Sequence, residues 1–280
     1  MTYDGYKALR IQVSDRIAHI TIDNPPMNLG DHVLVSDLAR FNAEVRTDDT
    51  VGVIVFDSAD PDYFYAHEDM ADAALMEQML QDNELNLFQE VRESYRTLPQ
   101  VTIAKVAGWV RGGGIEFATA LDLRFAALET ALFSQNEVSL GILPGGGGTQ
   151  YLPRLLGRSR ALEVIIGADA FDAALAERYG LINRALPADE LDGFVERLAQ
   201  RIASFPPGAV SLAKQAVDTG IGLSLPDGLR EENKLLRQTV TPQVIEFLQA
   251  ALKAGAQTRQ GELDMEGLID GLLRSQPPRR

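Results

Sequence analysis

The stretch Val110–Asp122, VRGGGIEFATALD, places three glycines ahead of a helix-like run that carries a glutamate among apolar neighbours. Glycine lets a backbone pass close to a ligand and aim its amide hydrogens at it. A helix that begins there adds the positive end of its dipole, which favours negative charge. The pattern indicates that an anion binds or develops at Gly112, Gly113 and Gly114, beside the carboxylate of Glu116. Close helix packing with a surface glutamate is the alternative that this segment alone leaves open.

The segments around this stretch alternate between strand and helix patterns. Residues 9–25 predict two strands that stop at Pro25-Pro26, and residues 51–64 and 101–110 predict buried strands. Residues 30–49 and 84–99 have the apolar spacing of helices. This order predicts a layered α/β domain with largely parallel strands and right-handed crossovers.

After about residue 189 only helical patterns follow, interrupted by proline and glycine. We therefore expect two parts, a core over residues 1–200 and a C-terminal helical oligomerisation region over residues 201–280. The helical part is expected to pack on the core or on another subunit.

Composition excludes several classes of function. The 280 residues carry a net charge of −14, which argues against nucleic acid and anionic membranes as partners. The chain has no cysteine, so disulfides, cysteine-ligated zinc and a thiol nucleophile are excluded. Neither a signal-peptide pattern nor a membrane-length apolar run is visible, so we expect a soluble, cytoplasmic protein. We also expect no metal site.

Three chemistry-bearing segments follow expected strands. FYAHEDM (64–70) and RGGGIE (111–116) come after buried strands, and FSQNEVSLGILPGGGGTQ (133–150) adds a second glutamate, Glu137, and a second glycine cluster. Open α/β sheets place their sites at such strand ends. A phosphate-binding loop is disfavoured, because no Lys-Ser or Lys-Thr pair follows the second glycine cluster.

From about Leu9 to Lys214 the chain resembles the enoyl-CoA hydratase/isomerase (crotonase) superfamily. The motifs that carry the resemblance are NPPMN (24–28), FYAHED (64–69), GGGIEFATALDLRFA (112–126), EVSLGILPGGGGTQYLPRLLG (137–157), LAERYGLINRALP (175–187) and LAKQA (212–216). The resemblance implies a crotonase-like spiral of repeated ββα units with a C-terminal helical region. It also implies assembly as a homotrimer or a dimer of trimers.

For the site, the resemblance implies an acyl-CoA thioester as substrate and no cofactor other than the coenzyme A that the substrate carries. The backbone amides of Glu68 and Gly113 would stabilise the enolate. Glu116 and Glu137 would hold a water and exchange protons with the substrate, which favours a 2-enoyl-CoA hydratase. The further residues that it places at the substrate or coenzyme A are Ala66, His67, Asp69, Gly112, Pro144 and Gly145.

The chain also departs from the family pattern. His67 stands where the family usually has glycine and Glu68 where it usually has alanine, and Asp60 and Asp62 replace an expected basic residue. His67 could bond the substrate, act as a third acid or base, or fill space. The acidic residues would repel a coenzyme A phosphate. Isomerisation, hydrolysis of a C–C bond without coenzyme A, and a non-catalytic scaffold therefore remain alternatives.

Overall fold

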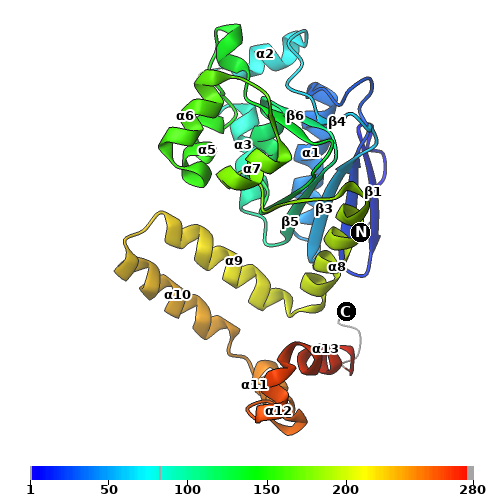
Figure 1. Cartoon of the computed structure of the whole chain (residues 1–280), viewed down its shortest axis with the longest axis vertical. Coiled ribbons are helices and arrows are strands. Elements are labelled where there is room, and N and C mark those ends of the chain that lie inside the picture. The colour runs from blue at the N-terminus through cyan, green and yellow to red at the C-terminus, as the bar shows by residue number, and fades with distance from the viewer. Residues whose placement is uncertain (1, 82, 276–280) are drawn as a thin grey trace. The chain divides into compact units, whose positions relative to one another are not determined.

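The computed structural model describes residues 2–81 and 83–275 of the chain (Figure 1). It divides into two compact units, Met1–Gln200 and Arg201–Arg280. The last five residues of the predicted helical region lie outside the described residues.

A six-stranded sheet forms the centre of the first unit. Its strands, in spatial order, are β1 (Leu9–Ser14), β2 (Ile17–Ile22), β3 (Val53–Ser58), β5 (Val101–Val106), β7 (Leu123–Ala127) and β10 (Arg184–Leu186). β1 and β2 pair antiparallel, and every later neighbour pairs parallel. The apolar run of β3 is buried, as expected for a parallel strand covered on both faces. The prediction of largely parallel pairing is confirmed.

A second sheet is built from four short strands, three of which directly follow a strand of the large sheet along the chain. It consists of β4 (Tyr63–Tyr65), β6 (Trp109–Arg111), β8 (Leu132–Ser134) and β9 (Phe171–Asp172). β4, β6 and β8 are parallel, and β9 is antiparallel to β8. Three times in succession the chain gives one strand to each sheet and then forms a helix. This arrangement confirms the predicted spiral of repeated ββα units.

The prediction of one continuous strand over residues 101–110 was wrong. The chain leaves the large sheet after Val106 and enters the small one at Trp109, whose amide donates to the carbonyl of Asp62 at 2.7 Å. A β-carbon on Gly108 would lie 2.4 Å from that same carbonyl oxygen. Only glycine allows this close passage, so Gly108 is where the chain changes sheets.

The helices of the first unit include the two that the apolar spacing over residues 30–49 and 84–99 predicts, α1 (His32–Val45) and α3 (Leu87–Arg96). In order they are α1, α2 (Ala73–Met79), α3, α4 (Gly113–Ala120), the 3-10 helix η1 (Glu137–Leu140), α5 (Gly148–Leu156), α6 (Arg158–Gly167), α7 (Ala173–Tyr179) and α8 (Ala188–Ser204), whose last four residues belong to the second unit. The side chain of Asp31 caps α1 through the amide of Leu34, and Asn86 with Gln89 forms a capping box on α3. By contrast, Gly112 offers α4 no side-chain cap.

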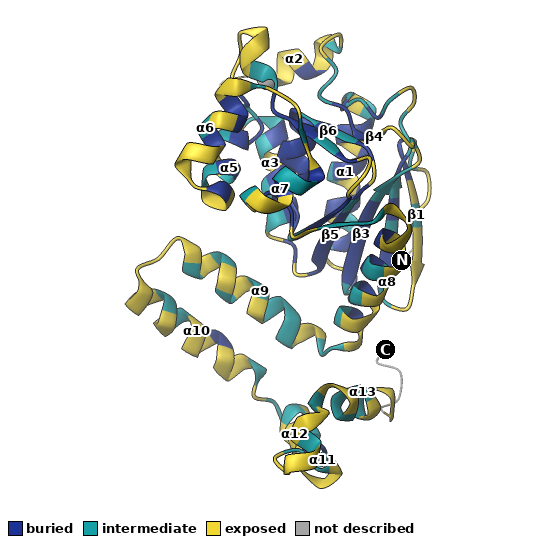
Figure 2. Cartoon of the chain, viewed as in Figure 1, coloured by how far each residue is buried: buried dark blue, intermediate teal, exposed yellow. Residues whose placement is uncertain are grey.

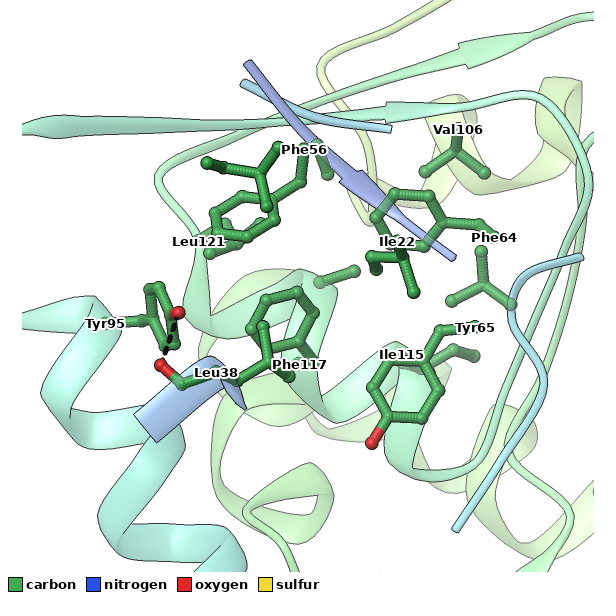
Figure 3. Close-up of a cluster of buried hydrophobic side chains, with 14 of the residues drawn as sticks. Ile22, Leu38, Phe56, Phe64, Tyr65, Tyr95, Val106, Ile115, Phe117 and Leu121 are labelled. Atoms are coloured by element: carbon green, nitrogen blue, oxygen red, sulfur yellow. Dashed lines mark hydrogen bonds between the residues drawn. The ribbon is translucent and has the colours of Figure 1, made fainter. Parts of the chain in front are cut away.

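Aromatic side chains hold α4 against the large sheet. Phe56 of β3, Tyr95 of α3 and Phe117 of α4 pack edge to face, with ring centroids 5.3–5.5 Å apart (Figure 3). The hydroxyl of Tyr95 donates to the carbonyl of Leu38 at 2.8 Å, which ties α3 to α1. Because Phe117 is adjacent to Glu116, this cluster fixes the position of that glutamate.

The second unit contains only helices among its described residues. They are α9 (Pro207–Ile221), α10 (Leu225–Thr239), α11 (Pro242–Ala254), α12 (Arg259–Leu263) and α13 (Met265–Ser275). Most of their residues are exposed or half-buried (Figure 2). In the part of the chain that the structure describes, no helix has both the length and the apolar character that crossing a membrane requires.

Candidate active site

The three segments singled out in the sequence meet at the ends of β4, β6 and β8. The amide of Gly112, directly after β6, donates to the carbonyl of Ser134 at the end of β8 at 2.9 Å. A β-carbon on Gly114 would lie 2.4 Å from the carbonyl oxygen of Tyr65 at the end of β4. The start of α4 therefore lies against the ends of β4 and β8, the two strands that flank β6.

Glu116 is held from two sides on the first turn of α4. Its side chain is 3% exposed. Its Oε1 accepts hydrogen bonds from the amides of Gly146 and Gly148, both at 2.8 Å. Its Oε2 lies 3.7 Å from the guanidinium of Arg92. The second glycine cluster thus orients this carboxylate through its backbone amides.

Glu137 occupies a different environment at the start of η1. Both of its carboxylate oxygens accept from Nε2 of Gln135 at 3.0 Å. Burial, and then the charge of Glu116, raise the pKa of Glu137 from 4.5 to about 7. A carboxyl group with such a pKa exchanges its proton near neutral pH, which suits a general acid.

Gly148 shows how close the two glutamates are. A β-carbon on this residue would lie 3.0 Å from Oε1 of Glu116 and 3.3 Å from Nε2 of Gln135, the donor that holds Glu137. On the other side, a β-carbon on Gly112 would lie 2.8 Å from Oε1 of Glu137. The structure therefore brings both glutamates to the start of α4, with glycines leaving room for them.

Among the described residues, the backbone amides of Glu68 and Gly113 donate no hydrogen bond. The bridge between Gly30 and the Glu68 segment uses the carbonyl of His67 and the amide of Asp69, and neither bond uses the amide of Glu68. Gly113 opens α4, where the first amides have no acceptor within a helix. These two N–H groups, on adjacent segments, suit a developing oxyanion.

The other predicted residues of the first loop have contacts within the chain. Ala66 is buried, and its amide donates to the carbonyl of Asn28 at 3.2 Å. Nδ1 of His67 lies 2.8 Å from the carbonyl oxygen of Glu68. The carboxylate of Asp69 accepts from the amide of Ala71 at 2.8 Å. The imidazole and this carboxylate therefore stabilise the conformation of their own loop.

The predicted residues of the second glycine segment also support its shape. Pro144 is buried, and the carbonyl of Gly145 accepts from the side-chain amides of Asn86 and Gln89 at 2.9 and 3.0 Å. These bonds tie the segment to the capping box of α3. Asp60, which we expected to repel a phosphate, accepts from the amides of its own turn into β4.

Three residues of the site were missed by the sequence interpretation, namely Tyr65, Arg92 and Gln135. Arg92 and Tyr65 are 3% and 1% exposed, and Gln135 is fully buried. One signal was available for Arg92. It shares the buried face of α3 with Phe88, Val91 and Tyr95, where a charged residue requires a buried partner.

Comparison with known proteins assigns the chain to a family. The family model described as enoyl-CoA hydratase/isomerase matches residues 12–259. The chain belongs to this family. A probable enoyl-CoA hydratase of Rhizobium meliloti is 34% identical over 234 residues, which cover 83% of this chain and 90% of that protein.

Solved structures agree with this assignment. A Streptomyces avermitilis protein, provisionally named an enoyl-CoA hydratase, is 44% identical with a TM-score of 0.73, over 97% of this chain and all of that one. An enoyl-CoA hydratase of Geobacillus kaustophilus is 31% identical with a TM-score of 0.83, over 89% and 95% of the two chains. The crotonase-like fold is therefore confirmed.

Proposed function

We propose that the protein is a 2-enoyl-CoA hydratase, which adds water across the α,β double bond of an acyl-CoA thioester. The observation that carries this proposal is the pair of glutamates in unlike environments. Glu116 accepts two backbone N–H bonds and faces Arg92, an arrangement of donors that suits a carboxylate. Glu137, whose pKa is raised to about 7, can carry a proton at neutral pH.

In this mechanism Glu116 accepts a proton from a water molecule as the water oxygen bonds to the β-carbon. The electron pair of the double bond moves toward the thioester carbonyl and forms an enolate. The amides of Glu68 and Gly113 donate to the enolate oxygen, and removing one such donor typically costs about 10²–10³ in rate. Glu137 then delivers its proton to the α-carbon, and the two carboxyl groups regain their starting states by exchange with solvent.

The residues that border this chemistry would position the thioester. We assign this role to the loop Ala66–Asp69 and to Gly112, Pro144 and Gly145. Support comes from the family assignment and from the relatives, several of which are named as enoyl-CoA hydratases. The absence of cysteine suits the reducing cytoplasm, where we place the reaction.

The test is the loss of the enoyl-thioester absorbance of crotonyl-CoA, followed with wild-type protein and with Glu116→Gln in parallel. Wild type should remove the band, and the variant should lose about 10²–10⁴-fold in rate while still binding the thioester by calorimetry. Equal rates for the two proteins would refute the role of Glu116. No reaction across a panel of enoyl-CoA thioesters would refute the hydratase assignment.

We also propose that the protein assembles as a homotrimer or a dimer of trimers. The helices of the second unit expose large apolar side chains, among them Ile221 at 71%, Leu225 at 76% and Leu263 at 74%. Apolar surface of this kind marks protein–protein contacts. Light scattering of the purified protein should give a mass of three or six chains, and a monomer would contradict the proposal.

A further inference from the structure

Arg92 lies between two carboxylates at the base of the site. Its guanidinium Nη2 is paired with Oε1 of Glu68, donates to the carbonyl of Gly113 at 3.0 Å, and lies 3.7 Å from Oε2 of Glu116. Its side chain is 3% exposed. The guanidinium of Arg92 is therefore hydrogen-bonded to the carboxylate of Glu68, whereas it lies near the carboxylate of Glu116 without a hydrogen bond to it.

The carboxylate of Glu68 is fixed in its half of this arrangement. The hydroxyl of Tyr65 lies 3.2 and 3.1 Å from its two oxygens and donates to them. β-Carbons on Gly30 and Gly113 would lie 2.1 and 2.2 Å from those oxygens, so two glycines leave the space that the carboxylate fills. Glu68 thus keeps the guanidinium of Arg92 close to its own carboxylate and away from that of Glu116.

The energetics of this group depend on the balance of its charges. Although burial by itself lowers the pKa of Arg92, the carboxylates of Glu68 and Glu116 raise it above its ordinary value. Burial raises the pKa of Glu68, and Arg92 offsets this only in part. Removing one member of such a buried set leaves the remaining charge uncompensated. Arg92 would then move to whichever carboxylate remains.

We propose that Glu68 and Arg92 are positioning residues for Glu116, with Glu68 holding Arg92 back so that Glu116 is oriented by the cation without being paired with it. This inference rests on the proposed hydratase function, in which Glu116 is the base. The charged or titratable groups that face Glu116 are Arg92 from α3, Glu68 and Tyr65 from β4 and its loop, and Glu137 from η1.

Opposite changes at the two positions should have opposite effects. Glu68→Gln keeps the shape of the side chain and its backbone amide but removes the charge, which frees Arg92 to pair with Glu116 and makes the base weaker. Arg92→Met removes the cation and leaves Glu116 beside another carboxylate, which makes the base harder to deprotonate. An opposite charge within contact distance typically moves such a titration by about one to three pH units.

The experiment records kcat/KM for crotonyl-CoA hydration against pH for wild type, Glu68→Gln, Arg92→Met and the double variant. The acidic limb of this profile reports the free enzyme's base. It should move to lower pH in Glu68→Gln, to higher pH in Arg92→Met, and lie between the two in the double variant. Arg92→Lys, which keeps the charge, should lie closer to wild type than Arg92→Met.

Arg124→Met is the matched control. Arg124 is also buried, but it donates to the carbonyls of Ala118, Leu121 and Leu181, so its loss should lower stability without moving the acidic limb.

Limbs that stay in place or move in the same direction in both single variants would overturn the inference. If Arg92→Met does not fold, Glu68→Gln alone tests the inference, because the acidic limb of its pH profile must move to lower pH. A wild type without hydratase activity would instead refute the proposed function.

Discussion

Replacing Glu137 by glutamine should stabilise the protein, by an amount that grows as the pH rises from 4.5 through about 7. Burial, with the neighbouring charge of Glu116, raises the pKa of Glu137 from 4.5 to about 7. Each pKa unit corresponds to about 1.4 kcal/mol, so ionising this group in the folded protein costs about 3 kcal/mol more than in the unfolded chain. Glutamine cannot ionise and avoids that cost.

The direction of the effect follows from proton binding. Between pH 4.5 and about 7 the folded protein holds a proton at Glu137 that the unfolded chain has already released. The stabilising contribution of this group is therefore complete below pH 4.5 and is lost as the pH rises through about 7. The stability gap between Glu137→Gln and wild type should open across this window and approach about 3 kcal/mol above it.

Urea unfolding at fixed protein concentration measures this gap, with the fluorescence of Trp109, the single tryptophan, as the signal. Glu232→Gln, a change at an exposed side chain of α10, serves as the control and should show no gap that grows with pH. A gap for Glu137→Gln that is the same at acidic and alkaline pH would refute the raised pKa. It would also remove the physical basis for Glu137 as the acid.

Three further predictions concern a glycine beside Glu116, Glu116 itself, and a buried arginine outside the site. Gly146→Ala should lower kcat at least tenfold, because its β-carbon would lie 2.3 Å from Oε2 of Glu116. Gly167→Ala, whose β-carbon would meet no described atom within 4 Å, should retain activity, and similar kinetics for both would contradict this. Glu116→Gln should leave the calorimetric affinity for the thioester within a few-fold of wild type, and lost binding would show that the residue holds substrate. Arg124→Met should lower the free energy of unfolding in urea by about 3 kcal/mol, since buried carbonyls lose their donor, and unchanged stability would contradict it.

Local signals made much of the fold predictable. The cap at Asp31, the stop at Pro25-Pro26 and the buried apolar run of β3 each depend on residues close in sequence. The order of strand and helix patterns then limits the topology to a few choices, because crossovers are right-handed. The three glycines before Glu116 likewise indicated the start of α4. Glycines at a helix start leave its first amides accessible, because they have no side chain that could cover them.

The features that sequence patterns missed depend on contacts between distant segments. The break before β6 arises because Gly108 passes against the backbone of Asp62, which no periodicity reveals. Arg92 and Glu68 are 24 residues apart and meet only when α3 packs beside the loop after β4. The raised pKa of Glu137 follows from burial in the folded chain, and the residue type alone carries no sign of it.

The most direct test of the hydratase assignment is mass spectrometry of the product formed from crotonyl-CoA in isotope-labelled water. Water addition should give a thioester that is heavier by one molecule of water, with the labelled oxygen on the acyl chain, and Glu116→Gln should form almost none of it. A product of unchanged mass would show isomerisation, and release of free coenzyme A would show thioester hydrolysis. Either result would contradict the assignment of Glu116 and Glu137 to water addition.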